Sequence, residues 1–212
     1  MGLHGQAIAT TIEMMADLRR IDPVVDDVAR RLGIVPDDLR RIFPSDQELL
    51  FAVAEQALVR LMDSCTKAVV RVHPDDAVGQ FLALGKAYVR WAAEHRMQFR
   101  LISGHPTLNA LQHPALRRYR DAIVDLMTRM LERARSAGLL RPDEDIGMIV
   151  LSSETFAYGL AHMVVDGRMK ELSPSGDPVE TAEMAMADFV TRFARTAAWQ
   201  PARDAKAASG KP

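Results

Sequence analysis

Two pairs of arginines near the start of the chain have the chemistry needed to recognise phosphate or guanine. Arg30 and Arg31 precede Gly33, and a second pair, Arg40 and Arg41, follows it. A guanidinium donates hydrogen bonds to phosphate oxygens and to the acceptor edge of guanine, so these four side chains are candidate DNA contacts. Aspartates stand within four residues of each pair. The alternative interpretation is therefore a solvated face of helical ion pairs.

The formal charge of this region is unfavourable for DNA binding. Residues 1–50 contain six arginines, no lysine, seven aspartates and two glutamates, which gives a formal charge of −3. Proteins that hold DNA neutralise its phosphates, and their binding domains usually carry a basic surface. The candidate contacts thus lie in an acidic segment, while the whole chain has a formal charge of only −1.

The sequence contains few residues in the patterns that metal sites and catalytic sites require. The histidines His95, His105, His113 and His162 include no pair four residues apart, and the single cysteine, Cys65, is distant from them in the sequence. A helical metal site would need such a pair or a cysteine cluster. A glycine-rich phosphate loop, a nucleophile elbow and a Glu-x-x-His pair are also missing. We expect no metal site, no cofactor and no catalytic residue, and therefore no enzyme.

The later part of the chain is rich in methionine and aromatic residues that could line an adaptable apolar pocket. Thioether side chains reshape around ligands, although ordinary core packing is the simpler interpretation for most of these residues individually. The candidate ligand contacts are Trp91, Phe99, Met127, Tyr158 and His162. Tyr158 and His162 are one helical turn apart and form the first pair to examine.

The elements that must position these side chains are helices. Apolar residues recur at spacings of three and four, as in Leu50, Val53, Ala54 and Ala57, whereas alternating β-branched runs are nearly absent. The pattern predicts an all-α fold of nine helices, over residues 6–18, 24–32, 37–42, 46–71, 77–94, 96–103, 114–137, 143–166 and 178–198. Gly33 is predicted to end the second helix with a positive φ, which glycine tolerates.

The second and third predicted helices, joined at Gly33, have the form of a helix-turn-helix, which lays its second helix in the DNA major groove. The predicted core of this head is Ile8, Ile12, Met15, Val28, Leu32, Ile34, Leu39 and Phe43. At this point the sequence resembles the N-terminal domain of the tetracycline-repressor-like (TetR) family of bacterial regulators. The resemblance rests on Val28-Ala29, Gly33-Ile34, Pro36, Leu39, Phe43-Pro44-Ser45 and Glu48-Leu49-Leu50. It covers about residues 6–60, with a weaker likeness at residues 88–95 and 156–168.

The resemblance implies a homodimer that binds operator DNA, responds to a small-molecule effector and pairs through its last two helices. It also implies a helix-turn-helix domain over residues 1–45 and a ligand-binding and dimerisation domain over residues 46–198. Residues 199–212 are predicted to be a disordered tail from their composition.

Several positions that meet phosphate in the family carry other chemistry here. Val24 stands where a hydroxyl residue usually begins the second helix, Val35 where a serine or threonine caps the third, and Asp46 where a lysine opens the fourth. Asp37, Asp38, Arg40 and Ile42 depart from the family pattern as well. The second hypothesis is therefore a TetR-fold protein that has lost DNA binding and acts as a small-ligand-binding or protein-interaction module.

Length and composition fit a globular protein. The chain has 212 residues, 48% of them hydrophobic and 26% charged, which are ordinary proportions. One cysteine excludes an intrachain disulfide and fits a reducing compartment. The sequence has no uninterrupted apolar run of about 18 residues and no charged signal-peptide start. We expect a cytoplasmic protein that does not interact with a membrane.

Overall fold

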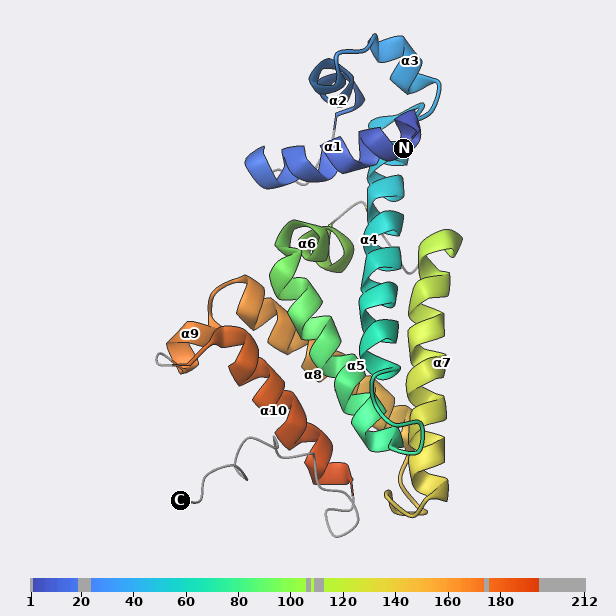
Figure 1. Cartoon of the computed structure of the whole chain (residues 1–212), viewed down its shortest axis with the longest axis vertical. Helices are drawn as coiled ribbons and strands as arrows, with labels where there is room; N and C mark the ends of the chain where they lie inside the picture. The colour runs from blue at the N-terminus through green and yellow to red at the C-terminus, as the bar shows by residue number, and fades with distance from the viewer. Residues whose placement is uncertain (1, 19–23, 106–107, 109–112, 174–175, 195–212) are drawn as a thin grey trace, which may run out of the picture. The chain divides into compact units, whose positions relative to one another are not determined.

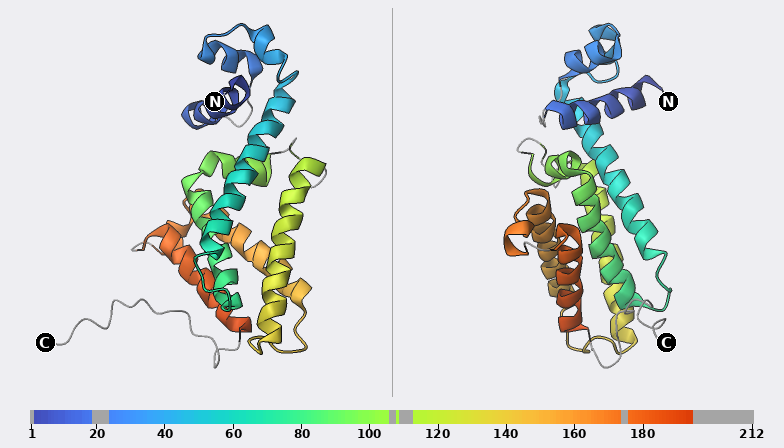
Figure 2. Two further views of the ribbon diagram at one scale, coloured as in Figure 1. Left: turned by 45° about the vertical axis from the view of Figure 1, so that its right-hand side comes forward. Right: turned by 60° about the vertical axis from the view of Figure 1, so that its left-hand side comes forward.

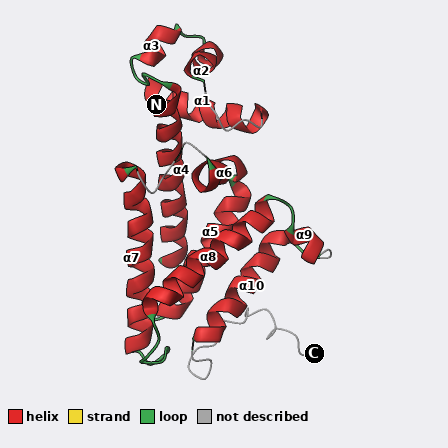
Figure 3. Cartoon of the chain, turned by 180° about the vertical axis from the view of Figure 1, so that it is seen from behind, coloured by secondary structure: helices red, strands yellow, loops and turns green. Residues whose placement is uncertain are grey.

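The computed structural model describes residues 2–18, 24–105, 108, 113–173 and 176–194, and all regular secondary structure in these residues is helical (Figures 1 and 3). The helices are α1 (Leu3–Leu18), α2 (Val25–Leu32), α3 (Pro36–Arg40), α4 (Asp46–Val69), α5 (Ala77–Glu94), α6 (Arg96–Gly104), α7 (Pro114–Ser136), α8 (Ile146–Val165), α9 (Met169–Leu172) and α10 (Pro178–Phe193). The predicted all-α fold is confirmed.

Each of the nine predicted helices is found, and the differences at their ends have local causes. α8 begins at Ile146 rather than at residue 143 because the Asp145 carboxylate accepts a hydrogen bond from the Met148 N–H and so caps the helix. The predicted end of the last helix at residue 198 is wrong, since α10 ends at Phe193 and Ala194 is extended. Residues 195–198 and the predicted tail lie outside the described residues.

The sequence missed α9, which lies between α8 and α10. This helix is a single turn of four residues, too short to show a 3.6-residue periodicity. It follows Gly167, whose φ of 79° ends the preceding helix.

The turn between α2 and α3 has the geometry predicted from Gly33. This glycine has φ 70° and ψ 28°, in the left-handed region. Its N–H donates to the Arg30 carbonyl and the Ile34 N–H donates to the Ala29 carbonyl, at 3.2 and 3.0 Å. The two bonds satisfy the last carbonyls of α2 and redirect the chain into α3.

The chain forms two compact units. The first contains residues up to Ser64 together with Trp91–Ile123, and the second contains Cys65–Arg90 and the described residues from Val124 onward. Helices α4, α5 and α7 each contribute residues to both units.

In the first unit, α1, α2 and α3 gather around the first turns of α4 (Figure 2). The predicted core is confirmed: Ile8, Met15, Val28, Leu39 and Phe43 are buried, and Ile12, Leu32 and Ile34 pack against them. The same cluster includes later residues, namely Leu49, Leu50, Val53, Ala54, Leu101, Leu108 and Leu116. The apolar core therefore continues past residue 45. The predicted division into a helix-turn-helix domain over residues 1–45 and a ligand-binding domain over residues 46–198 stays a prediction.

In the second unit, α8, α9 and α10 pack together (Figure 1). Phe156 of α8 stacks on Phe189 of α10 with ring centroids 4.6 Å apart, and Phe193 meets Phe81 of α5 edge-on at 6.0 Å. Gly85 of α5 allows the Met186 side chain to approach closely, because an added Cβ would lie 3.0 Å from its sulfur. These contacts join α5, α8 and α10 into one apolar core.

One helix in the described part of the chain, α8, is long and apolar enough to cross a membrane by length and composition. Its most apolar window is 44% buried within the structure. Glu154 and several small polar residues interrupt it, so the sequence shows no continuous apolar run. A core helix of a globular protein passes the same test, and α8 packs on α10 in that manner.

We predict that Gly33→Ala destabilises the protein by about 1–2 kcal/mol, the cost of placing a Cβ in the left-handed region. An added Cβ at Gly33 meets no atom within 4 Å, so backbone strain alone is responsible. Gly104→Ala is the matched control, since that site is equally open and lacks a positive φ. Urea denaturation measures both variants. Equal stability of the two variants would contradict the argument.

Candidate functional site

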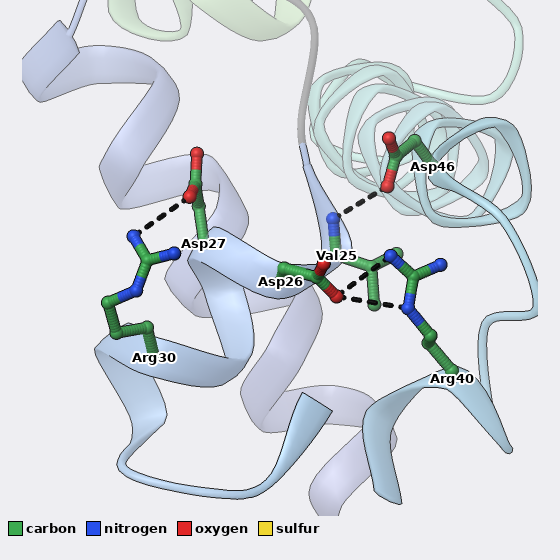
Figure 4. A network of polar contacts seen from close by, with 6 residues as sticks. All are labelled: Val25, Asp26, Asp27, Arg30, Arg40 and Asp46. Carbon is green, nitrogen blue, oxygen red and sulfur yellow. Dashed lines mark hydrogen bonds and ion pairs between the residues drawn. The ribbon is translucent and has the colours of Figure 1, made fainter. Parts of the chain in front are cut away.

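Arg30, Arg40 and Arg41, all candidate DNA contacts, form ion pairs with aspartates. Figure 4 shows the pairs of Arg30 and Arg40. Within α2, the Arg30 Nη1 lies 3.0 Å from Asp27 Oδ1, and at α3 the Arg41 Nη1 lies 3.1 Å from Asp38 Oδ1. Both pairs have the i, i+3 spacing that places two side chains on one helical face. Arg31 is exposed at the end of α2. For Arg30, Arg40 and Arg41 the structure therefore shows the ion pairs that the sequence offered as the alternative to DNA contacts.

The third pair joins the two helices of the helix-turn-helix. Arg40 of α3 donates through Nε and Nη2 to the same oxygen, Asp26 Oδ1 of α2, at 3.0 and 2.8 Å (Figure 4). The hydrogen bond that Arg40 donates to Asp26, and then the negative charge of Asp26, raise the pKa of Arg40, which stays fully cationic. This contact spans 14 residues of sequence and depends on the angle between α2 and α3.

A second long-range carboxylate contact lies at the start of α2. Val24 precedes the helix and its side chain forms no capping hydrogen bond. The Val25 N–H donates instead to Asp46 Oδ1 at 2.7 Å, from the first residue of α4 (Figure 4). A helix begins with unsatisfied N–H groups and a partial positive charge, and a carboxylate satisfies both. Asp46 therefore caps α2 from another helix.

The start of α3 lacks a side-chain cap, as its sequence predicts. Val35 precedes the helix without a capping hydrogen bond, and Pro36 takes the first helical position, where its missing N–H costs nothing. Asp37 and Asp38 occupy the first turn, where carboxylates stabilise the positive helix end. In a docked complex the same carboxylates would repel phosphate.

The helix-turn-helix carries arginines and aspartates that pair with one another, with an excess of acidic residues. Residues 24–50 carry four arginines against five aspartates and one glutamate. Exposed ion pairs are weak in water, because solvent and salt screen them. Phosphate could therefore replace the aspartates as the partner of each arginine, at the expense of leaving carboxylates beside the DNA.

The structure divides the five candidate ligand contacts between the two units. Trp91 and Phe99 lie in the first unit, and Met127, Tyr158 and His162 lie in the second. Trp91, Phe99 and Met127 are buried, whereas Tyr158 is 43% exposed. The structure therefore does not collect the five side chains in one unit.

Two buried donors lie in the first unit near the junction of α5 and α6. Trp91 Nε1 and Gln98 Nε2 are inaccessible and have no hydrogen-bond partner among the residues that the structure describes. The Trp91 ring lies 5.3 Å from that of His95. Buried donors usually find an acceptor, so an ordered water or a ligand carbonyl would satisfy these groups.

In the second unit, the predicted pair on α8 is in contact. The rings of Tyr158 and His162 lie 4.5 Å apart, and His162 Nδ1 is 3.7 Å from Asp166 Oδ2. Among the described residues, no group of three or more histidine, cysteine, aspartate or glutamate side chains is placed to hold a metal ion.

Tyr88 interacts electrostatically with Tyr158 of this pair and also with Cys65, a proximity that the sequence did not predict. Burial raises the pKa of the Tyr88 hydroxyl, and the neighbouring Tyr158, Cys65 and Glu154 add to the shift. Burial also raises the pKa of the Cys65 thiol, from 9.0 to about 12. Both groups are therefore neutral at physiological pH. Their separation in sequence left no local signal of this proximity.

The sequence and the fold both match known regulators. The family model described as "Tetracyclin repressor-like, C-terminal domain" matches residues 81–189. No curated protein matches the chain.

Solved structures resemble the chain over nearly its whole length. A protein of unknown function from Rhodococcus sp. RHA1 is 24% identical with a TM-score of 0.77, covering 92% of this chain and 97% of that one. A tetR-family regulatory protein from Rhodococcus RHA1 is 21% identical with a TM-score of 0.66, covering 88% and 94%. The ketosteroid transcriptional regulator KstR2 of Mycobacterium tuberculosis is 16% identical with a TM-score of 0.66, covering 92% and 96%. At these identities the likeness shows a shared fold.

We predict that the stability of the protein falls as pH rises from 9.0 toward about 12, partly through Cys65. A thiol whose folded-state pKa is raised stabilises the fold below its unfolded-state pKa and loses that contribution at higher pH. Urea denaturation at increasing pH measures the decline, and Cys65→Ala should show a shallower one. In native protein at neutral pH a maleimide should label Cys65 only slowly. Rapid labelling would contradict its burial.

Proposed function

The chain belongs to the tetracycline-repressor-like family, and we propose that it is a ligand-responsive transcriptional regulator that binds operator DNA as a homodimer. The observation that carries the proposal is the α2–Gly33–α3 geometry on a TetR-family regulator fold. The regulator fold also argues against an enzyme. A regulator of this kind acts in the cytoplasm, where its DNA is.

In the proposed complex, α3 enters the major groove and the four arginines supply the positive charge. Arg30 and Arg31 lie in the last turn of α2, while Arg40 and Arg41 lie at the end of α3. Two heads must be separated by roughly one turn of DNA, about 34–36 Å. An effector that changes this separation would change operator affinity.

The homodimer is proposed to form through α8 and α10. Met148, Leu151 and Tyr158 follow one face of α8 and are each about half exposed, and Met184 of α10 is more exposed still. Gly147, Ser152 and Gly159 are exposed on the same helix and permit close approach of a second helix. An exposed apolar face of this kind is typical of a subunit interface.

The effector is proposed to be a small, largely apolar molecule. The candidate contacts form two separate sets: Trp91 and Phe99 are buried in the first unit, and Met127, Tyr158 and His162 belong to the second, where the rings of Tyr158 and His162 are in contact.

A second candidate function is favoured by the ion pairs of the head. Asp26, Asp27 and Asp38 already pair with Arg40, Arg30 and Arg41, and in this alternative the protein has lost DNA binding. It would then act as a small-ligand-binding or protein-interaction module on the same fold.

DNA affinity over a salt series separates the two functions. For the regulator, we expect the affinity for a random-sequence duplex to fall steeply with salt, by roughly a factor of 10³ or more between 50 and 200 mM if six or more phosphates are contacted. Fluorescence anisotropy measures it, with protein refolded from denaturant to remove any bound ligand. Lack of binding at the lowest salt contradicts direct DNA binding and favours the second function.

We predict that Leu151→Arg converts the dimer to a monomer without loss of helix content, since a buried unpaired charge opposes association. Size-exclusion chromatography with light scattering gives the mass, and circular dichroism gives the helix content. Leu172→Arg is the matched control: Leu172 is 72% exposed on α9, outside the proposed interface. A dimeric Leu151→Arg protein would place the interface elsewhere.

A further inference from the structure

The first turn of α2 already binds an anion, and that anion belongs to the protein. The beginning of a helix attracts phosphate, because its first N–H groups lack partners and its dipole is positive there. In α2 the Val25 N–H donates to Asp46 Oδ1 at 2.7 Å, a distance typical of a charge-assisted hydrogen bond. The carboxylate is therefore bound where a phosphate oxygen would otherwise bind.

A second carboxylate, that of Asp26, accepts hydrogen bonds from the Arg40 guanidinium of α3. Asp26 accepts both Nε and Nη2 of Arg40, a pair of donors that also suits a phosphate oxygen. Figure 4 shows the two contacts side by side, with Val25 and Asp26 adjacent at the start of α2. One donor group from each helix of the helix-turn-helix is thus engaged by an internal anion.

The two carboxylates differ in what holds them. Asp26 belongs to α2 itself, whereas Asp46 is the first residue of α4 and lies 21 residues from its partner. Asp46 is exposed whereas Val25 is fully buried, so a phosphate would reach this N–H only after the carboxylate has moved away. Breaking the contact would leave α2 without the cap that Val24 cannot supply.

We infer that Asp46 is an autoinhibitory residue: its carboxylate occupies the place of a DNA phosphate at the start of α2 and must be displaced before the head binds DNA. The inference rests on the proposed DNA-binding function. It differs from a simple lost contact, because Asp46 both competes with phosphate and stabilises the helix that would receive it. A charge reversal such as Asp46→Lys removes the inhibition and the cap together.

The test therefore uses Asp46→Asn, which keeps an oxygen acceptor for the Val25 N–H and removes the charge. The matched control is Glu48→Gln, which removes one charge from the same first turn of α4. The contact of Glu48 in this turn is made by its backbone N–H, which donates to Ser45 Oγ at 3.2 Å. Asp46→Ala, which removes both charge and acceptor, reports the capping role.

The affinity of each full-length protein for a fluorescein-labelled random-sequence duplex is measured by anisotropy over a salt series. We expect Asp46→Asn to bind about three- to tenfold more tightly than the native protein at low salt, and Glu48→Gln to gain less than about twofold. Asp46→Ala should lower the thermal unfolding midpoint by about 3 °C or more, and Asp46→Asn by less. Hydrogen exchange at the Val25 amide should quicken most in Asp46→Ala.

The outcomes separate this inference from the proposed function. If Asp46→Asn and Glu48→Gln gain equally, general charge explains the effect and the autoinhibitory role is overturned while DNA binding stands. If the native protein does not bind and Asp46→Asn does, the inference is supported and the native protein fits the second candidate function. If neither the native protein nor any variant binds at the lowest salt, both DNA binding and autoinhibition are overturned.

Discussion

Burial of one apolar cluster in the first unit determines where the helix-turn-helix lies and which polar groups meet on its surface. α2 and α3 have eight and five residues, too few for stable helices in isolation, since nucleating a helix is costly. Val28 and Leu39 belong to the same buried cluster as Leu49 and Leu50 of α4. This packing supports both short helices and brings the first residue of α4 to the first turn of α2.

The polar surface of the head follows from that packing. Two of its ion pairs are local and form wherever the helix forms, since their members are three residues apart. The Asp26–Arg40 and Asp46–Val25 contacts require α2, α3 and α4 to be packed together. The backbone has the geometry of a helix-turn-helix, while arginine and aspartate side chains on it pair with one another. Whether phosphate displaces the carboxylates decides between the two candidate functions.

The second unit has a different character. Its core is aromatic and apolar, with Phe156 on Phe189 and Phe81 on Phe193. α8 has one face in this core and exposes an apolar stripe on the other. A helix that is apolar on both sides gains stability when a second surface covers the exposed side. The proposed homodimer and the membrane-like composition of α8 therefore have the same physical origin.

The sequence by itself determined the helices and the turn between α2 and α3, because short-range interactions along the chain set both. Apolar spacing predicted nine of the helices, and Gly33 predicted the left-handed turn, because both signals act over a few residues. Only the tertiary structure decided the partner of Asp46, the partner of Arg40, the proximity of Cys65 to Tyr88, and the distribution of the five candidate ligand contacts between two units. Contacts over 14 or 21 residues have no periodic signal. They exist only because buried apolar side chains set the positions of the helices that carry them.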